Sequence, residues 1–289
     1  MCRFLVYRGY PLLLEDLVVR PSNSLIAQSL HAKKRNKPVN GDGFGLGWYP
    51  LHNDPEPGTF VSIEPAWSNR NLIQLARKVY SQHFFAHVRD ASTGMSVAEA
   101  NCHPFQHKNF LWMHNGRLDQ FALFRRPLLN ALSDPAFEVI RGSTDSEYAF
   151  ALYLDAIQFN DQASAQEMER ALLVTIRKII SLRVEYGAMT NAFMNFAVSN
   201  GKSIVVSRYA TDRKVQPASL FYAQGKFIRD QPGDFLLQGA EHARSNVIIC
   251  SEPLTCHKEN WLRVKRNHMI TVNATGTIKV QPIPIDYQT

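Results

Sequence analysis

The amino-acid sequence predicts an α+β fold, in which strands and helices form separate layers of one domain. Segments with strand periodicity come first, helical segments occupy the middle of the chain, and short strand segments return after them. A parallel sheet built from βαβ units would instead alternate strands with helices. No internal repeat or linker divides the sequence, so we expect a single domain over residues 2–289.

The first half of the chain is predicted to contain four strands and two helices. In chain order these are a strand at 2–7, a helix at 22–31, a strand at 43–49, a helix at 71–82, and strands at 84–88 and 110–114. Glycine alternates with Phe44, Leu46 and Trp48, so one face of that strand lacks side chains and permits close approach of another backbone. Asn115-Gly116 is a turn signal and predicts the end of the last of these strands.

The second half is predicted to combine three helices with six short strands. The helices are expected at 119–132, 145–159 and 165–186, and the strands at 192–199, 203–209, 219–223, 246–251, 268–272 and 277–281. Thr144 followed three residues later by Glu147 is the pattern of a capping box. We therefore expect these two residues to open the middle helix.

Composition and charge exclude several classes of protein. Hydrophobic residues make up 45% and charged residues 20% of the chain, which excludes disordered, collagenous and coiled-coil proteins. No segment approaches the ~20 consecutive apolar residues of a membrane-spanning helix. The net charge of +7 comes from scattered Lys and Arg, so we expect neither nucleic acid nor membrane as a partner.

Cysteine and histidine usage indicates a reducing compartment and gives no metal-binding pattern. Four cysteines in 289 residues are too few for a disulfide scaffold, and the N-terminal segment does not read as a secretory signal. We therefore expect a cytoplasmic location. His83 and His87 have the spacing of a zinc motif, but the glutamate of that motif is missing. We expect no metal and no cofactor.

Cys2 is the first candidate for a catalytic residue. Removal of the initiator Met would give a chain that starts with a thiol and an α-amine on the same residue. The pKa of such an amine is ~7.7–8.0, so it is suited to act as a base near neutral pH. A thiol beside a base is an activated nucleophile. The alternative is a cysteine that lies in the terminus by chance.

Three further positions could bind or stabilise a substrate, and each has a simpler interpretation. Arg89 could present its planar fork to a carboxylate, or it could be a surface residue that pairs locally. Asn115 and the backbone N–H of Gly116 could form an oxyanion hole, or they could be an ordinary turn. Asp145 could receive an ammonium group from the first turn of its helix, although the cap itself is a sufficient structural reason for that segment.

These motifs, taken together and in this order, resemble the class II glutamine amidotransferases, which are N-terminal-nucleophile hydrolases. The segments that carry the resemblance are Cys2-Arg3-Phe4, Asn40-Gly41-Asp42-Gly43-Phe44-Gly45, His87-Val88-Arg89, Asn101-Cys102-His103-Pro104-Phe105, His114-Asn115-Gly116, Ser143-Thr144-Asp145-Ser146-Glu147, Val205-Val206-Ser207-Arg208-Tyr209 and Ser251-Glu252-Pro253-Leu254-Thr255. They cover nearly the whole chain. The branch of the family that the sequence resembles most is that of the amidotransferase-like subunits of glutathione-degradation complexes.

The resemblance implies a four-layer αββα sandwich of the N-terminal-nucleophile hydrolase type. It also implies that Cys2 is the nucleophile and that its own α-amine is the base. By the same resemblance, Arg89 holds the α-carboxylate of the substrate and Asp145 holds its α-ammonium. Asn115 and the N–H of Gly116 form the oxyanion hole.

A further substrate contact is implied in the segment after Arg89, where either Ser92 or Thr93 occupies the corresponding place; Thr93 is our prediction. The implied activity is hydrolysis of the γ-glutamyl bond of glutathione, with a metallopeptidase-like subunit as a possible partner. Alternatives within the same chemistry are a glutaminase and a γ-glutamyl hydrolase of ergothioneine biosynthesis. Alternatives from other classes are a non-catalytic regulatory subunit and, on charge alone, a nucleic-acid-binding module.

Overall fold

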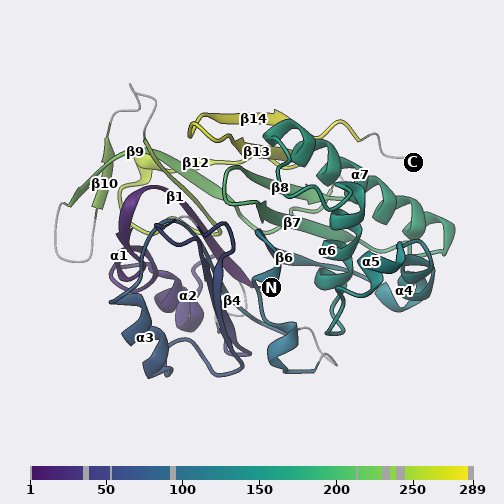
Figure 1. The fold of residues 1–289 in the computed structure, drawn as a ribbon, viewed down its shortest axis with the longest axis horizontal. Coiled ribbons are helices and arrows are strands. Elements are labelled where there is room, and N and C mark those ends of the chain that lie inside the picture. Colours follow the sequence, from purple (N-terminus) through teal and green to yellow (C-terminus); the bar gives the residue numbers. More distant parts are fainter. Residues whose placement is uncertain are drawn as a thin grey trace.

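Two antiparallel β-sheets lie face to face in the computed structural model, with helices on the outer face of each sheet (Figure 1). The structure describes residues 2–34, 39–52, 54–91, 96–212, 214–229, 235–238 and 245–285. The N-terminal end of the chain lies between the two halves of the molecule in Figure 1, where β1 contacts β6. This arrangement brings the first residues of the chain to the boundary between the sheets.

The first sheet has the strand order β10-β9-β11-β1-β4-β2-β3, and β12 pairs with β9 outside this path. Its strands are β1 (Arg3–Leu13), β2 (Phe44–Trp48), β3 (Gly58–Ser62), β4 (Tyr80–Val88), β9 (Phe221–Arg229), β10 (Phe235–Gln238), β11 (Asn246–Cys250) and β12 (Leu262–Arg263). The helices associated with it are α1 (Glu15–Val18), α2 (Leu25–His31) and α3 (Arg70–Ala76). The first strand of the chain is therefore an interior strand of the sheet, between β11 and β4.

The second sheet has the order β14-β13-β8-β7-β6-β5. Its strands are β5 (Phe105–His107), β6 (Phe110–Leu118), β7 (Ala192–Ser199), β8 (Ile204–Ala210), β13 (His268–Val272) and β14 (Ile278–Pro282). The helices packed beside it are α4 (Phe121–Asn130), α5 (Asp134–Phe137), α6 (Asp145–Ala156) and α7 (Ala165–Glu185). Two short 3₁₀ helices, η1 (Glu99–Asn101) and η2 (Lys258–Asn260), lie in connecting segments.

Three hydrophobic cores correspond to the three interfaces between four layers. One core packs α4, α6 and α7 against the second sheet, and another packs the N-terminal helices against the first sheet. The third lies between the sheets and includes Phe4, Phe85, Met113 and Val206. The predicted four-layer αββα sandwich is therefore confirmed.

The predicted strand end at Asn115-Gly116 is wrong. β6 continues through both residues to Leu118, because Asn115 pairs with Asn195 and Gly116 with Met194 of β7. The pairing with a strand far along the sequence overrides the local tendency of Asn-Gly to turn. The candidate oxyanion residues therefore lie inside a strand and not in a loop.

The predicted capping box is confirmed in one half only. The side chain of Thr144 accepts the N–H of Glu147, and α6 begins at Asp145. The carboxylate of Glu147 does not return to Thr144; it accepts the backbone N–H groups of Arg141 and Gly142 at 2.8 and 2.7 Å. Glu147 therefore fixes the loop before the helix, and this loop leads directly to Asp145.

The glycine face of β2 lets a neighbouring segment approach, as predicted. A Cβ atom added at Gly45 would overlap the carbonyl oxygen of His103, and one at Gly47 would lie 2.8 Å from Pro104 and 2.9 Å from Leu111. The absence of side chains at these two glycines lets the segment from His103 to Leu111 lie close to the first sheet.

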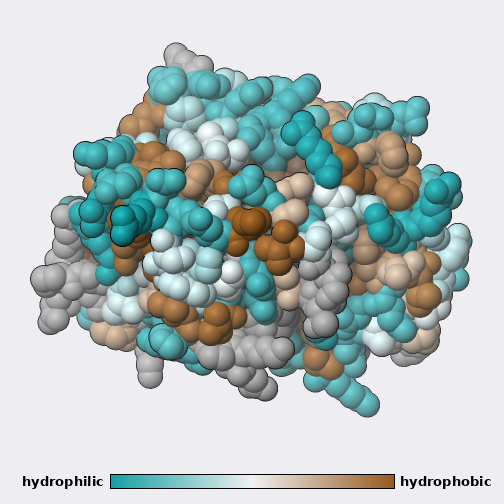
Figure 2. Space-filling view, turned by 90° about the horizontal axis from the view of Figure 1, so that it is seen from below, coloured by the Kyte–Doolittle hydropathy of each residue, from teal (hydrophilic) through white to brown (hydrophobic). Residues whose placement is uncertain are grey.

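One face of the molecule is chemically mixed. Figure 2 shows hydrophobic residues in small groups among hydrophilic ones on the face seen from below. Within the described part of the chain, no helix is both long enough and apolar enough to cross a membrane.

Candidate active site

Cys2 lies immediately before β1, beside the end of β4. The register of the two strands pairs Arg3 with Val88, so the residues after Val88 run past Cys2. The backbone N–H of Asp90 is directed at Cys2 Sγ at 3.5 Å, and the thiol is directed at the Asp90 carbonyl oxygen at 3.8 Å. Only 8% of Cys2 is exposed.

Burial raises the pKa of the Cys2 thiol above its ordinary value, and the N–H of Asp90 and the charge of Arg89 oppose this rise only in part. The thiol is therefore protonated near neutral pH. Since the thiolate is the reactive form, Cys2 needs a base close to it in order to act as a nucleophile.

Arg89 is only 4% exposed, and the described groups that its guanidinium contacts are uncharged. Its guanidinium donates to the carbonyl oxygens of Ser96 at 3.1 Å and Asp42 at 3.4 Å. None of the ion pairs between described residues includes Arg89. A buried cation without a carboxylate partner is costly unless a ligand supplies the anion. Arg89 is thus suited to bind a carboxylate.

Asp145 is the first residue of α6 and is 9% exposed. Its Oδ2 accepts the backbone N–H of Leu118 at 2.6 Å, and its Oδ1 accepts Ser146 Oγ at 3.3 Å. The bond from Leu118 attaches the carboxylate to the end of β6, three residues beyond Asn115. No described cation pairs with it, so lone pairs of the carboxylate are available to an ammonium group.

Asn115 is completely buried and projects from β6 toward the first sheet. Its Nδ2 donates to Ser251 Oγ at 3.2 Å, and Ser251 lies beside Phe4 of β1. The next residue must be glycine for steric reasons, because a Cβ atom at Gly116 would overlap the carbonyl oxygen of Phe193. The strand that follows Cys2 and the candidate oxyanion amide are therefore joined through one serine.

The carbonyl group of Cys2 is held by a buried ion pair. Arg3 Nη1 donates to it at 2.9 Å, and Arg3 Nε donates to Glu252 at 2.9 Å. Each of the two charged side chains is only 1% exposed. Glu252 also accepts the backbone N–H groups of Lys33 and Lys34. The sequence pattern singled out Ser251–Thr255 only through the family resemblance, and the structure supplies the physical reason.

The histidines near the site are buried, and burial favours their neutral form. Burial lowers the pKa of His87 to about 3 and lowers that of His103 well below its ordinary value. The two rings pack at a centroid distance of 4.3 Å. His114 bonds Ser146 Oγ and the Phe193 carbonyl oxygen, each at 2.8 Å. Among the described residues, no group of three or more His, Cys, Asp or Glu side chains is arranged to hold a metal ion.

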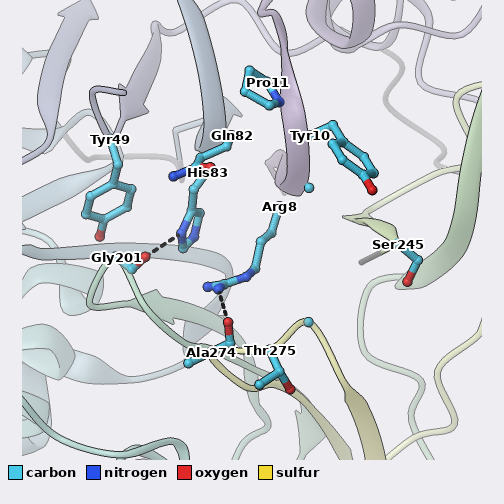
Figure 3. Close-up of a pocket in the computed structure, with 12 residues that line it drawn as sticks. Arg8, Tyr10, Pro11, Tyr49, Gln82, His83, Gly201, Ser245, Ala274 and Thr275 are labelled. Carbon is cyan, nitrogen blue, oxygen red and sulfur yellow. Dashed lines mark hydrogen bonds between the residues drawn. The ribbon is translucent and has the colours of Figure 1, made fainter. Parts of the chain in front are cut away.

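The predicted substrate contact at Thr93, and its alternative Ser92, lie outside the described residues. Cys2, Arg89, Asn115 and Asp145 are described, and they come from the starts or ends of β1, β4 and α6 and from β6. A cavity of about 480 Å³ lined by Arg8, Tyr49 and His83 contains none of them. Figure 3 shows this cavity, where the Arg8 guanidinium is directed at the carbonyl oxygen of Ala274.

The sequence matches the family model described as class II glutamine amidotransferases over residues 16–287. It is 36% identical over 307 aligned positions to the probable glutamine amidotransferase DUG3 of Saccharomyces cerevisiae. This alignment covers 99% of this chain and 85% of the yeast protein. It is 32% identical over 125 positions to the gamma-glutamyl-hercynylcysteine sulfoxide hydrolase of Mycolicibacterium smegmatis, over 43% of this chain and 54% of that protein.

A solved structure, that of a glutamine aminotransferase class-II domain protein from Silicibacter pomeroyi, shares the fold with a TM-score of 0.65 and 26% sequence identity. The similarity covers 97% of this chain and 99% of that one. The predicted N-terminal-nucleophile type of sandwich is thereby confirmed. From the match of the family model over nearly the whole chain, we conclude that the protein belongs to the class II glutamine amidotransferases.

Proposed function

We propose that the protein hydrolyses the γ-glutamyl amide bond of glutathione to glutamate and Cys-Gly through a thioester on Cys2. The observation that carries this proposal is the buried Arg89, whose described partners are all uncharged and which follows β4 directly beside Cys2. A free α-carboxylate is the natural counter-ion for such a guanidinium. Asp145, also buried and without a described cationic partner, supports an α-ammonium as the second handle.

These contacts support the following course for the proposed reaction. Arg89 and Asp145 hold the amino-acid head, and the side-chain amide reaches Cys2. With Met1 removed, the α-amine of Cys2 takes the thiol proton, and sulfur attacks the amide carbon. The electron pair moves to the carbonyl oxygen, which Asn115 and the N–H of Gly116 stabilise.

Collapse of this intermediate expels the amine of the leaving group, which takes a proton from the α-ammonium of Cys2. A γ-glutamyl thioester remains on the sulfur. Water then attacks the thioester carbon, with the α-amine as base, and releases glutamate and the free thiol. No metal or cofactor enters either step.

The head-group contacts do not depend on what leaves, so related γ-glutamyl substrates use the same site. The similarity to a gamma-glutamyl-hercynylcysteine sulfoxide hydrolase supports hydrolysis of a γ-glutamyl bond and makes that substrate class the first alternative. Glutamine is the second alternative. The resemblance of the sequence to the amidotransferase-like subunits of glutathione-degradation complexes favours glutathione in our proposal.

We further propose a metallopeptidase-like partner subunit, because Cys-Gly is a dipeptide that a peptidase would consume. The partner is expected on family resemblance. All four cysteines are free thiols, which fits a reducing compartment, and we propose a cytoplasmic location.

Glutamate release by the purified protein tests the proposal. Glutathione, glutamine and an S-alkylated γ-glutamylcysteine are supplied in parallel. Mass spectrometry checks that Met1 is absent. We expect release from glutathione in the wild type and none in Cys2→Ala. Release that survives Cys2→Ala would refute the role of the nucleophile, and faster turnover of another substrate would replace glutathione as the leaving-group assignment. Assay with a metallopeptidase added shows whether a partner changes the rate.

A further inference from the structure

Ser251 lies where β11 ends, and it connects the strand of Cys2 with the side chain of Asn115. Its backbone N–H donates to the carbonyl oxygen of Phe4 at 3.0 Å, and its Oγ accepts the N–H of Phe4 at 3.0 Å. The same Oγ accepts Asn115 Nδ2 at 3.2 Å. One hydroxyl group therefore contacts both the backbone two residues after the nucleophile and the amide assigned to the oxyanion hole.

The surroundings of this hydroxyl exclude water. Ser251, Asn115 and Phe4 are each 0% exposed. The carbonyl oxygen of Ser251 accepts Ser219 Oγ at 2.8 Å, so the backbone of Ser251 is fixed as well. Loss of the Ser251 hydroxyl would leave the N–H groups of Phe4 and Asn115 without their acceptor in a buried environment.

The amide of Asn115 has two N–H bonds, and Ser251 uses one of them. No described residue accepts the second N–H bond of Asn115. Fixing the first bond at Ser251 sets the plane of the amide and therefore the direction of the second. A donor fixed in advance stabilises a developing oxyanion without the cost of reorientation during the reaction.

We propose that Ser251 is a positioning residue for the oxyanion hole, because its hydroxyl orients the Asn115 amide relative to the strand that carries Cys2. Ser251 acts on the transition state through Asn115 and needs no contact with the substrate. This inference rests on the proposed roles of Cys2 and Asn115. It gives the segment that begins at Ser251 a function in acyl transfer.

Steady-state kinetics of glutamate release give the first test. The variants are Ser251→Ala, Ser251→Thr, Asn115→Ala and the double variant Ser251→Ala with Asn115→Ala. We expect Ser251→Ala to lower kcat roughly tenfold with KM within twofold, since loss of a whole oxyanion donor costs about 100-fold or more. Ser251→Thr keeps the hydroxyl and should restore most of kcat. The double variant should be no slower than Asn115→Ala alone.

Ser81→Ala is the matched control. Ser81 is also 0% exposed, and its hydroxyl also accepts a backbone N–H, that of His83 at 3.0 Å, near the start of β4 and away from Cys2. Loss of this buried hydroxyl should leave kcat unchanged. An equal loss of kcat in Ser81→Ala and Ser251→Ala would overturn the inference, because it would show only the general cost of removing a buried serine.

Two reactions of the Cys2 thiol separate positioning from general structure without any γ-glutamyl substrate. In acylation by p-nitrophenyl acetate, sulfur attacks the ester carbon, the carbonyl oxygen becomes an oxyanion, and p-nitrophenolate leaves. In alkylation by iodoacetamide, sulfur displaces iodide in one step and no oxyanion forms. Peptide mass spectrometry measures the modification of Cys2 in both cases. We expect Ser251→Ala to slow acylation roughly tenfold, as for kcat, and to leave alkylation unchanged.

Each outcome decides the matter. Equal slowing of both reactions would mean that Ser251 only supports the structure, and no slowing would mean that it has no role; both overturn the inference. The inference is also overturned if the two losses of kcat multiply in the double variant. It is overturned as well if Asn115→Ala does not slow the acylation of Cys2. If the wild type releases no glutamate but Ser251→Ala selectively slows acylation, the proposed function fails and this inference stands.

Discussion

Replacement of Glu252 by Ala should destabilise the protein strongly, because it removes a buried carboxylate that the guanidinium of Arg3 binds in the interior. The two charged groups are 2.9 Å apart and each is 1% exposed. Removal of one partner of such a buried pair costs about 3–5 kcal/mol. The N–H groups of Lys33 and Lys34 also lose their acceptor, but these residues are exposed, so water can replace it. We therefore expect a loss of about 3–5 kcal/mol in the free energy of unfolding.

Urea unfolding followed by circular dichroism measures this loss. The matched control is Asp119→Ala, which removes the acid of an ion pair with Arg117 whose side chains are 25% and 53% exposed. An exposed pair contributes about 0–1 kcal/mol, so this control should remain close to the wild type. If Glu252→Ala also stays within about 1 kcal/mol of the wild type, the reasoning from burial is refuted.

Two further variants distinguish the missing charge partner from the missing side chain. The double replacement Arg3→Met with Glu252→Leu removes both charges and keeps similar volume, so it should recover most of the stability. Glu252→Gln keeps the volume and one acceptor oxygen and should lose less than Glu252→Ala. Because Arg3 also donates to the carbonyl oxygen of Cys2, the double variant is expected to fold but to turn over substrate more slowly.

Three other predictions concern the site and its pH dependence. Asn115→Ala should lower kcat by about 100- to 1,000-fold with little change in KM, because one oxyanion donor is lost; unchanged turnover would refute the role of Asn115. Arg89→Met should raise the KM for glutamine or glutathione by roughly 30-fold or more, because loss of the guanidinium leaves the buried α-carboxylate of the substrate unpaired and costs at least about 2 kcal/mol of binding free energy. A substrate that lacks the α-carboxylate should have the same KM in the variant and the wild type. Stability should fall as pH decreases from 6.5, because burial lowers the pKa of His83 and His87 from 6.5 to about 3, so the unfolded chain binds more protons in this range. Each histidine contributes up to about 1.4 kcal/mol per pH unit. Urea unfolding at pH 5 to 6.5, where most carboxylates stay ionised, should show a smaller slope in His83→Gln, and an identical slope would contradict the assignment.

The long, strongly patterned elements could be predicted from the sequence. The strand predicted at 192–199 is β7 with the same bounds, and the helix predicted at 165–186 is α7 to within one residue. Short elements without a pattern of their own were not predicted, for example α1, β3 and β12. Their formation depends on neighbours that are distant in sequence, as β12 depends on β9.

The wrong prediction at Asn115-Gly116 has the same physical cause. Local propensity favours a turn, but eight pairs with β7 keep β6 extended through both residues. Glycine is required there because the Phe193 carbonyl oxygen occupies the space of a side chain, and not because the chain reverses. The local sequence shows a glycine at position 116, but the steric reason for that glycine lies in a strand almost 80 positions away.

The identity of the candidate site residues could be predicted from motifs, but their mutual positions could not. No spacing in the sequence indicates that Ser251 would touch both Phe4 and Asn115, which are 247 and 136 positions away. The roles of Cys2, Arg89, Asn115, Gly116 and Asp145, and that of Thr93 outside the described residues, stay predictions. The kinetic tests address Cys2, Arg89 and Asn115.

The two sheets divide the proposed chemistry between them. The first sheet supplies Cys2, at the start of β1, and Arg89, after the end of β4. The second sheet supplies Asn115 from β6, and the end of β6 holds Asp145. A bound γ-glutamyl group would therefore span the boundary between the sheets, so turnover should depend on their relative position. The hydrophobic core between the sheets sets this position, and the bond from Asn115 to Ser251 crosses the boundary between them.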